Sequence, residues 1–216
     1  DPAYTWNKIV SKIENHKIKA SDFQDMFDSF NTNAKRNELA EADFANVFSD
    51  VNLGDNRLGS STNERAKALN AIVVMINEFT FKDDSGRDVL GDVYEYLIGQ
   101  FAANAGKKGG EFYTPHEVSQ ILAKIVTTGK NRLKSVYDPT CGSGSLLLRV
   151  AREVKDVSNF YGQEMNRTAY NLARMNMILH GVSTANQDLH NADTLDQDWP
   201  TEEPTNFDAV LMNPPY

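Results

Sequence analysis

The stretch that decides the fold is Asp138-Pro139-Thr140-Cys141-Gly142-Ser143-Gly144-Ser145. It follows a short β-prone run, residues 135–137, which predicts a strand ending at Asp138, and it precedes an amphipathic helix over about residues 146–154. Glycines at such a junction let a ligand approach the backbone, and the exposed N–H groups of a helix start favour an electronegative group. Many nucleotide-binding proteins with open sheets carry a similar loop, so the loop alone does not identify the ligand.

Downstream of this loop the pattern alternates between strands and helices. Residues 159–162 predict a second strand, and a long helix follows over about residues 167–180, where Gly181 ends it. Residues 207–212 predict a third strand. Strands separated by helices indicate an α/β fold with a parallel sheet and right-handed crossovers.

Upstream of the loop, about the first hundred residues predict helices. Two apolar stripes have helical spacing: Phe23, Met26, Phe27 and Phe30, then Phe44, Val47, Phe48 and Val51. Ser61 and Glu64 form a capping box before a further apolar stripe, and residues 88–101 predict another amphipathic helix. We interpret the aromatic stripes as core packing, and residues 1–105 as an all-helical N-terminal domain.

A glycine-rich joint over residues 105–110 is where we place the domain boundary, so the second domain covers residues 110–216. Thr114, Pro115 and Glu117 then predict a capped helix start, with Thr114 at the N-cap, Pro115 at the first helical position and Glu117 at the third. The apolar positions of this helix, which we expect to be buried, are Val118, Ile121, Leu122 and Ile125.

Composition limits the protein class. The 216 residues are 40% hydrophobic, which is too high for disorder, and the longest apolar run, residues 71–76, is too short to cross a membrane. The single cysteine, Cys141, cannot form an internal disulfide, so we expect a reducing, cytoplasmic environment. A net charge of −8 disfavours a chain that grips nucleic acid by its overall field. Locally, however, residues 105–134 hold six basic and two acidic side chains, whereas residues 183–208 hold seven acidic ones and no Lys or Arg.

Glu164 narrows the interpretation of the glycine loop. It stands at the end of the second predicted strand, 26 residues after Asp138. A carboxylate at that place can accept hydrogen bonds from both hydroxyls of a ribose. The two features together predict a nucleoside-containing cofactor.

The final four residues, Asn213-Pro214-Pro215-Tyr216, carry the most specific chemistry. They follow the third predicted strand, where ligands bind in open α/β sheets. The Asn213 side-chain oxygen and the Pro214 carbonyl can accept from both hydrogens of a planar amino group, which localises the nitrogen lone pair for attack. Tyr216 offers a flat face on which a base can stack.

With these motifs the chain resembles the modification (methyltransferase) subunit of type I restriction–modification systems, within the adenine-N6 DNA methyltransferases. The resemblance is carried most specifically by Asp88-Val89-Leu90-Gly91-Asp92-Val93-Tyr94-Glu95-Tyr96-Leu97 and by Gly110-Glu111-Phe112-Tyr113-Thr114-Pro115. It implies an all-helical N-terminal domain followed by a partial, truncated Rossmann-like fold of the kind that binds S-adenosylmethionine.

The resemblance also implies roles for individual residues. S-adenosylmethionine would lie over the loop residues Asp138, Thr140, Gly142, Ser143 and Gly144, with Asp138 near its methionine part. Glu164 would hold the ribose and Asp193 the adenine amino group, and Glu111, Tyr113 and Thr114 would supply a second cofactor-contacting motif. The catalytic residues would be Asn213, Pro214, Pro215 and Tyr216, around a flipped target adenine. Cys141 is interpreted as a packing residue, because the proline–cysteine context of a cytosine-C5 enzyme is absent.

The partners that the resemblance implies are DNA, a specificity subunit, a second modification subunit and a restriction subunit. Because the chain begins at Asp1 and stops at the catalytic turn, we expect a fragment holding about half of the catalytic domain, and therefore an inactive one.

Three alternatives stay open at this point. A protein-glutamine N5 methyltransferase shares the proline–tyrosine motif, because an amide nitrogen poses the same lone-pair problem. A structural or assembly module without activity would also fit a partial sheet. A nicotinamide-dependent oxidoreductase fits less well, because it has no use for the Asn213 motif.

Overall fold

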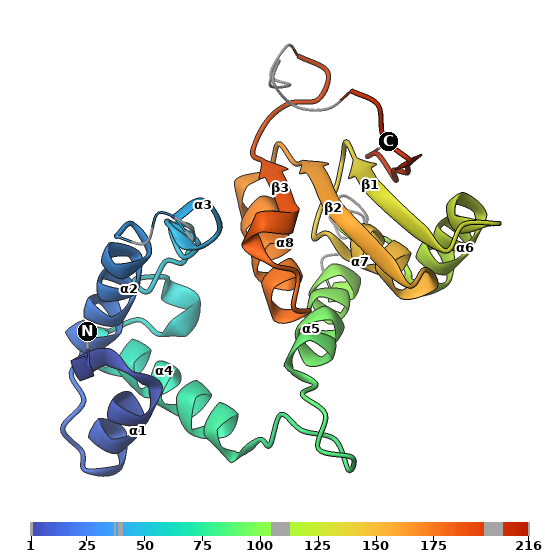
Figure 1. Ribbon diagram of the computed structural model, residues 1–216. Coiled ribbons are helices and arrows are strands. Elements are labelled where there is room, and N and C mark those ends of the chain that lie inside the picture. Colours follow the sequence, from blue (N-terminus) through green and yellow to red (C-terminus); the bar gives the residue numbers. More distant parts are fainter. Residues whose placement is uncertain (1, 37, 39–40, 105–112, 197–204, 216) are drawn as a thin grey trace. The chain divides into compact units, whose positions relative to one another are not determined.

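The computed structural model describes residues 2–36, 38, 41–104, 113–196 and 205–215 (Figure 1). The chain forms two compact units, Asp1–Asp88 and Val89–Tyr216, which are considered separately here. Within the described ranges, no helix combines the length and the apolar character that crossing a bilayer requires.

The first unit is helical, as predicted. It contains η1 (Pro2–Tyr4), α1 (Trp6–Glu14), α2 (Ala20–Ala34), α3 (Glu41–Phe44), η2 (Asn56–Leu58) and α4 (Thr62–Glu78). Its core is built on Ile9, Phe23 and Val73, one residue from each of the three longest helices. The predicted capping box is confirmed: Ser61 Oγ accepts from the Glu64 N–H, and the Glu64 carboxylate accepts from the Ser61 N–H.

The second aromatic stripe of this unit is not helical, and the prediction of a helix over residues 44–51 was wrong. Helix α3 ends at Phe44, and the chain continues in turns, with Asn46 at a φ of 58°. The aromatic side chains still serve the core, because Phe48 stacks on Phe27 at 4.8 Å between ring centroids and lies edge-on to Phe30 at 5.2 Å. Tertiary packing of the rings therefore outweighs their helical spacing.

The second unit is an α/β structure, which confirms the predicted fold class. Four strands, β1 (Arg132–Asp138), β2 (Asp156–Gln163), β3 (Gln187–His190) and β4 (Ala209–Val210), form a parallel sheet in the order β3-β2-β1-β4. Its helices are α5 (Leu90–Asn104), α6 (His116–Thr127), α7 (Ser145–Glu153) and α8 (Arg167–Leu179), with a short η4 (Thr184–Asn186) before β3. Helix α7 packs on β1 and β2, and α8 packs beside β3.

The core of this unit lies between the sheet and its helices. Its buried side chains include Leu133, Val136, Leu147, Val150 and Met177. The strand and helix of the glycine loop agree with the prediction, and α8 ends before Gly181, which has a φ of 76°. Strand β3 was not predicted, because its sequence, Gln-Asp-Leu-His, has neither an apolar run nor a β-branched residue.

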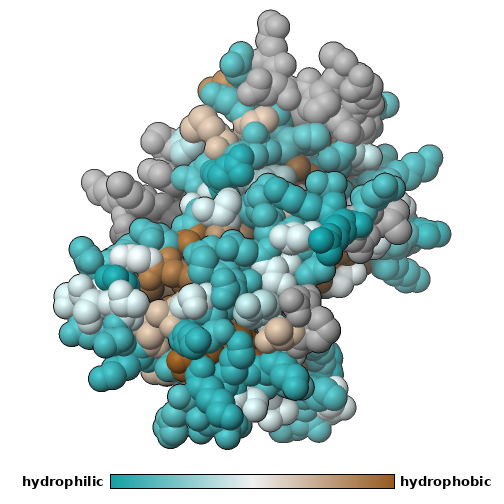
Figure 2. Space-filling view, turned by 90° about the vertical axis from the view of Figure 1, so that its left-hand side faces the viewer, coloured by the Kyte–Doolittle hydropathy of each residue, from teal (hydrophilic) through white to brown (hydrophobic). Residues whose placement is uncertain are grey.

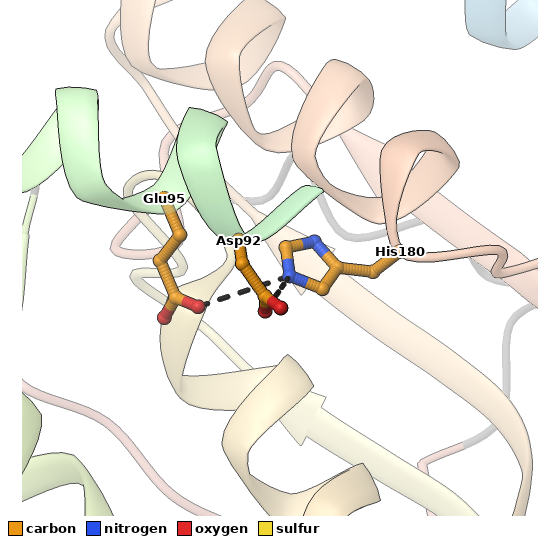
Figure 3. Close-up of side chains that lie close together, drawn as sticks. All are labelled: Asp92, Glu95 and His180. Carbon is orange, nitrogen blue, oxygen red and sulfur yellow. Dashed lines mark ion pairs between the residues drawn. The ribbon is translucent and has the colours of Figure 1, made fainter. Parts of the chain in front are cut away.

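Helix α5 belongs to the second unit, although the sequence analysis assigned residues 1–105 to one helical domain. The unit boundary follows Asp88, and α5 packs against α8. The physical reason is a charged cluster in which Asp92, Glu95 and His180 place their polar atoms within 4.8 Å of one another (Figure 3). The Arg152 guanidinium of α7 donates to Asp92 at 3.0 Å and to Glu95 at 3.2 Å, and its nitrogen lies 3.0 Å from His180 Nε2. Arg152 thus supplies the positive charge of this cluster and fastens α5 to α7 and α8.

Helix α6 differs from its prediction in two ways. It begins at His116, with Pro115 rather than Thr114 at the N-cap, and no side chain caps it. Of its four apolar positions, Leu122 packs against the core as predicted, whereas Val118, Ile121 and Ile125 are exposed, Ile121 at 60% and Ile125 at 64%. The surface in Figure 2 is mostly hydrophilic, with apolar residues gathered in separate patches.

Candidate functional site

The candidate site lies where the carboxyl ends of the four parallel strands meet. Asp138 ends β1, Glu164 directly follows β2, Asp193 follows β3 and Asn213 follows β4. Because all four strands run in the same direction, these residues lie along one edge of the sheet. The sheet order places the Asp138 loop between the Glu164 and Asn213 segments. Residues far apart in sequence therefore share one candidate site.

The glycine loop after β1 is a tight turn that starts α7. Gly142 and Gly144 adopt positive φ values of 53° and 75°, which L side chains rarely adopt, and Gly144 is the N-cap of α7. Two hydrogen bonds tie the loop's backbone to its surroundings: the Cys141 N–H donates to the Gln163 carbonyl at 2.9 Å, and the Asn176 side-chain Nδ2 donates to the Ser143 carbonyl at 3.0 Å. The loop is therefore shaped and held by the folded chain itself.

Glu164 is the residue that joins the loop to the next strand. Its Oε2 accepts from the Gly142 N–H at 3.0 Å and its Oε1 accepts from the Asn166 N–H at 2.7 Å. Burial raises the pKa of this half-buried carboxyl, while the two N–H donors oppose that rise. A carboxylate has about four acceptor positions, so two hydrogen bonds still leave capacity for a pair of hydroxyl groups.

Asp138 lies beneath the loop rather than at its surface. It is only 1% exposed, and its Oδ1 accepts from the Thr140 N–H at 2.9 Å in an Asx turn. Burial, with a smaller contribution from the nearby Glu164 carboxylate, raises the pKa of Asp138 to about 7 against the opposing hydrogen bonds from Thr140. In the described structure Asp138 thus shapes the loop from inside.

Three residues that sequence reasoning missed connect the carboxyl ends of β1, β2 and β3. The Thr194 hydroxyl donates to the Pro139 carbonyl, and Asn191 Nδ2 donates to the carbonyl of Glu164 at 2.8 Å. The buried Gln163 accepts from the Tyr137 hydroxyl at 2.6 Å. Asn191 and Thr194 flank Asp193 in the stretch Asn191-Ala192-Asp193-Thr194-Leu195, which the resemblance identified for Asp193 alone, and Gln163 stands in no motif. Asp193 itself accepts from the Leu195 N–H at 3.0 Å.

Asn213 and Thr114 meet although they are 99 residues apart in sequence. Asn213 Nδ2 donates to Thr114 Oγ1 at 3.3 Å, so the structure joins the two motifs that precede α6 and follow β4. Pro214 and Pro215 are exposed, while Asn213 is half-buried. The expectations for Glu111 and Tyr216 fall outside the described residues.

Tyr113 packs toward α5. A Cβ on Gly99 would lie 3.4 Å from the Tyr113 hydroxyl, which shows how closely the ring covers that glycine. Burial raises the pKa of Tyr113, and the Glu95 carboxylate raises it further. The tyrosine is therefore a neutral packing group.

Cys141 is a packing residue, as the sequence analysis interpreted it. It is 5% exposed, and its sulfur fills the space above Gly162, where an added Cβ would lie 3.1 Å from it. Burial raises the pKa of the thiol well above its usual range, so the nucleophilic thiolate is disfavoured.

Comparison with known proteins bears on this geometry. The N-6 DNA Methylase family model matches residues 85–216, which contain every residue of the candidate site. The chain is 37% identical over its full length to the type I restriction enzyme MpnII methylase subunit of Mycoplasma pneumoniae, and spans 42% of that protein. It is 34% identical over 67% of its length to the MjaIX methylase subunit of Methanocaldococcus jannaschii, and spans 26% of that one.

Among solved structures, the methyltransferase subunit of the type I restriction–modification system of Streptococcus thermophilus is similar over the whole chain. The TM-score is 0.88 at 42% identity, and the chain covers 45% of that structure. The chain thus spans less than half the length of each of these relatives. On the family match and the full-length similarity, the chain belongs to the N-6 DNA methylase family.

Proposed function

We propose that this chain carries the cofactor-binding and amino-group-binding parts of an enzyme that transfers a methyl group from S-adenosylmethionine to the N6 amino group of adenine in DNA. The observation that carries the proposal is the position of Asn213. Its carboxamide lies at the carboxyl edge of the sheet, in the segment that follows the strand next to the glycine loop. Asn213 would thus accept from the target amino group beside the loop for which we propose the cofactor.

The residues present fit S-adenosylmethionine. Glu164 has acceptor positions left beyond its bonds to Gly142 and Asn166, which suits two ribose hydroxyls. Asp193, on the segment that Thr194 ties to the loop, would accept from the adenine amino group. Thr140, Gly142, Ser143 and Gly144 form the loop over which the methionine part would lie, with Asp138 beneath it. When bound, the cofactor supplies an activated sulfonium methyl group.

The chain's own contribution is orientation and electrostatics. The Asn213 side-chain oxygen and the Pro214 carbonyl accept from the two hydrogens of the target amino group, which draws the nitrogen lone pair out of conjugation with the ring. Pro215 stiffens the turn, and Tyr216 stacks on the base. Unstacking a base from DNA costs a few kcal/mol, which these contacts must offset. Tyr113 and Thr114, with Glu111 before them in the sequence, would supply the second cofactor-contacting motif.

We also propose that the protein works as the modification subunit of a type I restriction–modification complex. The Mycoplasma pneumoniae protein that matches this chain along its whole length is a type I methylase subunit. A chain with a net charge of −8 does not need to hold DNA alone if a specificity subunit supplies most of the phosphate contacts. This subunit would then receive one flipped adenine, with a second modification subunit and a restriction subunit in the full assembly.

The test is methyl transfer by the full-length polypeptide assembled with its specificity subunit. With tritiated S-adenosylmethionine and DNA, we expect label in N6-methyladenine after nucleoside digestion. Asn213→Ala should lower kcat by at least about 100-fold while leaving the Kd of the cofactor within about twofold, because the lost acceptor acts on the target amino group.

The matched control is Asn206→Ala, an exposed asparagine just before the same strand, which should keep wild-type activity. Label appearing in a protein glutamine instead of DNA would replace the proposal with the amide methyltransferase. Normal transfer by Asn213→Ala would refute the assignment of the site.

A further inference from the structure

The start of α6 leaves one hydroxyl group without its expected role. Thr114 has the sequence signature of a helix N-cap, yet the helix begins two residues later and Pro115 occupies the N-cap with a ψ of 143°. A residue before proline is kept out of the helical conformation by steric contact with the proline ring, so Thr114 stays outside the helix. Its hydroxyl oxygen accepts instead from Asn213 Nδ2 at 3.3 Å.

In the structure the nitrogen of the Asn213 carboxamide faces Thr114 and donates to its hydroxyl oxygen. A carboxamide carries an acceptor oxygen on one side and a donor NH2 on the other, and the two are nearly equal in size. When the nitrogen donates to Thr114, the oxygen faces away from Thr114 and is left as an acceptor. The opposite orientation would present N–H groups to the N–H groups of a target amino group, which repel each other.

Thr114 is well placed to act as a fixed reference, because Tyr113 before it and His116 two residues after it are both anchored in the second unit. On one side, the Tyr113 ring packs over Gly99 of α5. On the other side, His116 Nδ1 lies 2.7 Å from a guanidinium nitrogen of Arg149, a buried residue of α7. Helix α7 is the same helix that begins at the glycine loop.

We propose that Thr114 is a positioning residue for methyl transfer: its hydroxyl oxygen holds the nitrogen of the Asn213 carboxamide and thereby directs the side-chain oxygen toward the target amino group. The inference rests on the proposed function and adds a role beyond the cofactor contact that the family resemblance implies for Thr114. Misorientation of a group that binds the reacting atom costs catalysis rather than ground-state binding, so the effect falls on kcat.

The experiment compares Thr114→Val, Thr114→Ala and Thr114→Ser in the full-length protein assembled with its specificity subunit. Valine keeps the shape but removes the acceptor oxygen, alanine removes it without added bulk, and serine retains it. We expect Val and Ala to lower kcat at saturating S-adenosylmethionine by about 30- to 100-fold, in addition to any change in the Kd of the cofactor, while the KM for DNA stays within about threefold. Serine should restore kcat to within about threefold of wild type.

Thr128→Val is the matched control, because Thr128 is exposed at the other end of α6 and its hydroxyl only donates to the Lys124 carbonyl at 2.8 Å. It should leave all three parameters unchanged. The thermal midpoint of each variant, measured alongside, separates lost folding from lost turnover.

Two results would overturn the inference. In the first, the Val and Ala variants weaken cofactor binding but keep wild-type kcat at saturating cofactor, which would make Thr114 a cofactor contact alone. In the second, the Ser variant is as impaired as Val, so that the hydroxyl is not the active feature. Absence of DNA methylation by the wild-type assembly is a different failure, because it would refute the proposed function and this inference with it.

Discussion

The two sides of the candidate site are held in different ways. The loop over Asp138–Ser145 is buried, and three hydrogen bonds fix its backbone. The N–H groups of Cys141 and Gly142 donate to the Gln163 carbonyl and the Glu164 carboxylate, and the Ser143 carbonyl accepts from the Asn176 side chain. The turn that begins at Asn213 is more open. In the described part of the chain, its Asn213 side chain has one hydrogen bond, to Thr114, and the prolines that follow are exposed.

This difference suggests a division of labour. The glycine loop is already ordered by folding, so a ligand that binds it loses little free energy to ordering the loop. The Asn213 turn depends on one contact from a distant segment, so its geometry responds to small changes there. The predictions below test whether the loop side is as preorganised as its contacts indicate.

The largest expected effect comes from Glu164→Ala. This change removes the acceptor of the Gly142 and Asn166 N–H groups and the acceptor proposed for the ribose, so the Kd of S-adenosylmethionine should rise by at least about 100-fold, or about 3 kcal/mol. Isothermal titration calorimetry measures it. Glu117→Ala, an exposed carboxylate of α6, is the control and should bind normally. Unchanged affinity in Glu164→Ala would remove the basis for a ribose site.

An intermediate effect is expected for Asp138→Asn. Burial raises the pKa of Asp138 from 3.8 to about 7, so between these values the folded chain holds a proton that the unfolded chain has released. This contribution to the free energy of unfolding is complete below pH 3.8 and is lost as the pH rises through 7, by about 2 kcal/mol between pH 5 and pH 7. Asparagine keeps the acceptor for Thr140 and removes the titration, so this loss of stability should largely disappear.

Urea unfolding without cofactor at several pH values measures this dependence. A shallower slope of the same sign remains in the variant, because burial also raises the pKa of Glu164. Asp156→Asn removes an exposed ion pair with Arg132 and should leave the wild-type slope in place. A wild-type protein whose stability rises between pH 5 and pH 7 would contradict the assignment to Asp138.

The smallest effect is expected for Gly162→Ala, under the loop. The added Cβ would lie 2.8 Å from Leu189 Cδ2 and 3.1 Å from the Cys141 sulfur, so the unit should lose about 1 kcal/mol of unfolding free energy. Differential scanning calorimetry measures the change. Since the closest atom belongs to a movable side chain, the double variant with Leu189→Ala should show a favourable coupling energy. Strict additivity would show that the strain lies elsewhere.

The parts of the molecule that sequence could predict are those governed by local pattern. The glycine loop, the strands around it and the capping box at Ser61 all follow from residue type and spacing. The parts it could not predict depend on distant partners: β3 exists because it pairs with β2, and α5 joins the second unit because Arg152 reaches its carboxylates. Thr114 shows both aspects, because its local signature is a helix cap while its observed partner lies 99 residues away.

The single cysteine has a practical consequence. Cys141 lies within the glycine loop and packs over Gly162, and its thiol is both buried and kept protonated. A thiol reagent can therefore react with this thiol in the folded chain only when the loop opens, and no other thiol among these 216 residues competes for the label. The rate at which Cys141 is labelled would therefore report how often the loop opens, without any engineered probe. A bound cofactor would lower that rate.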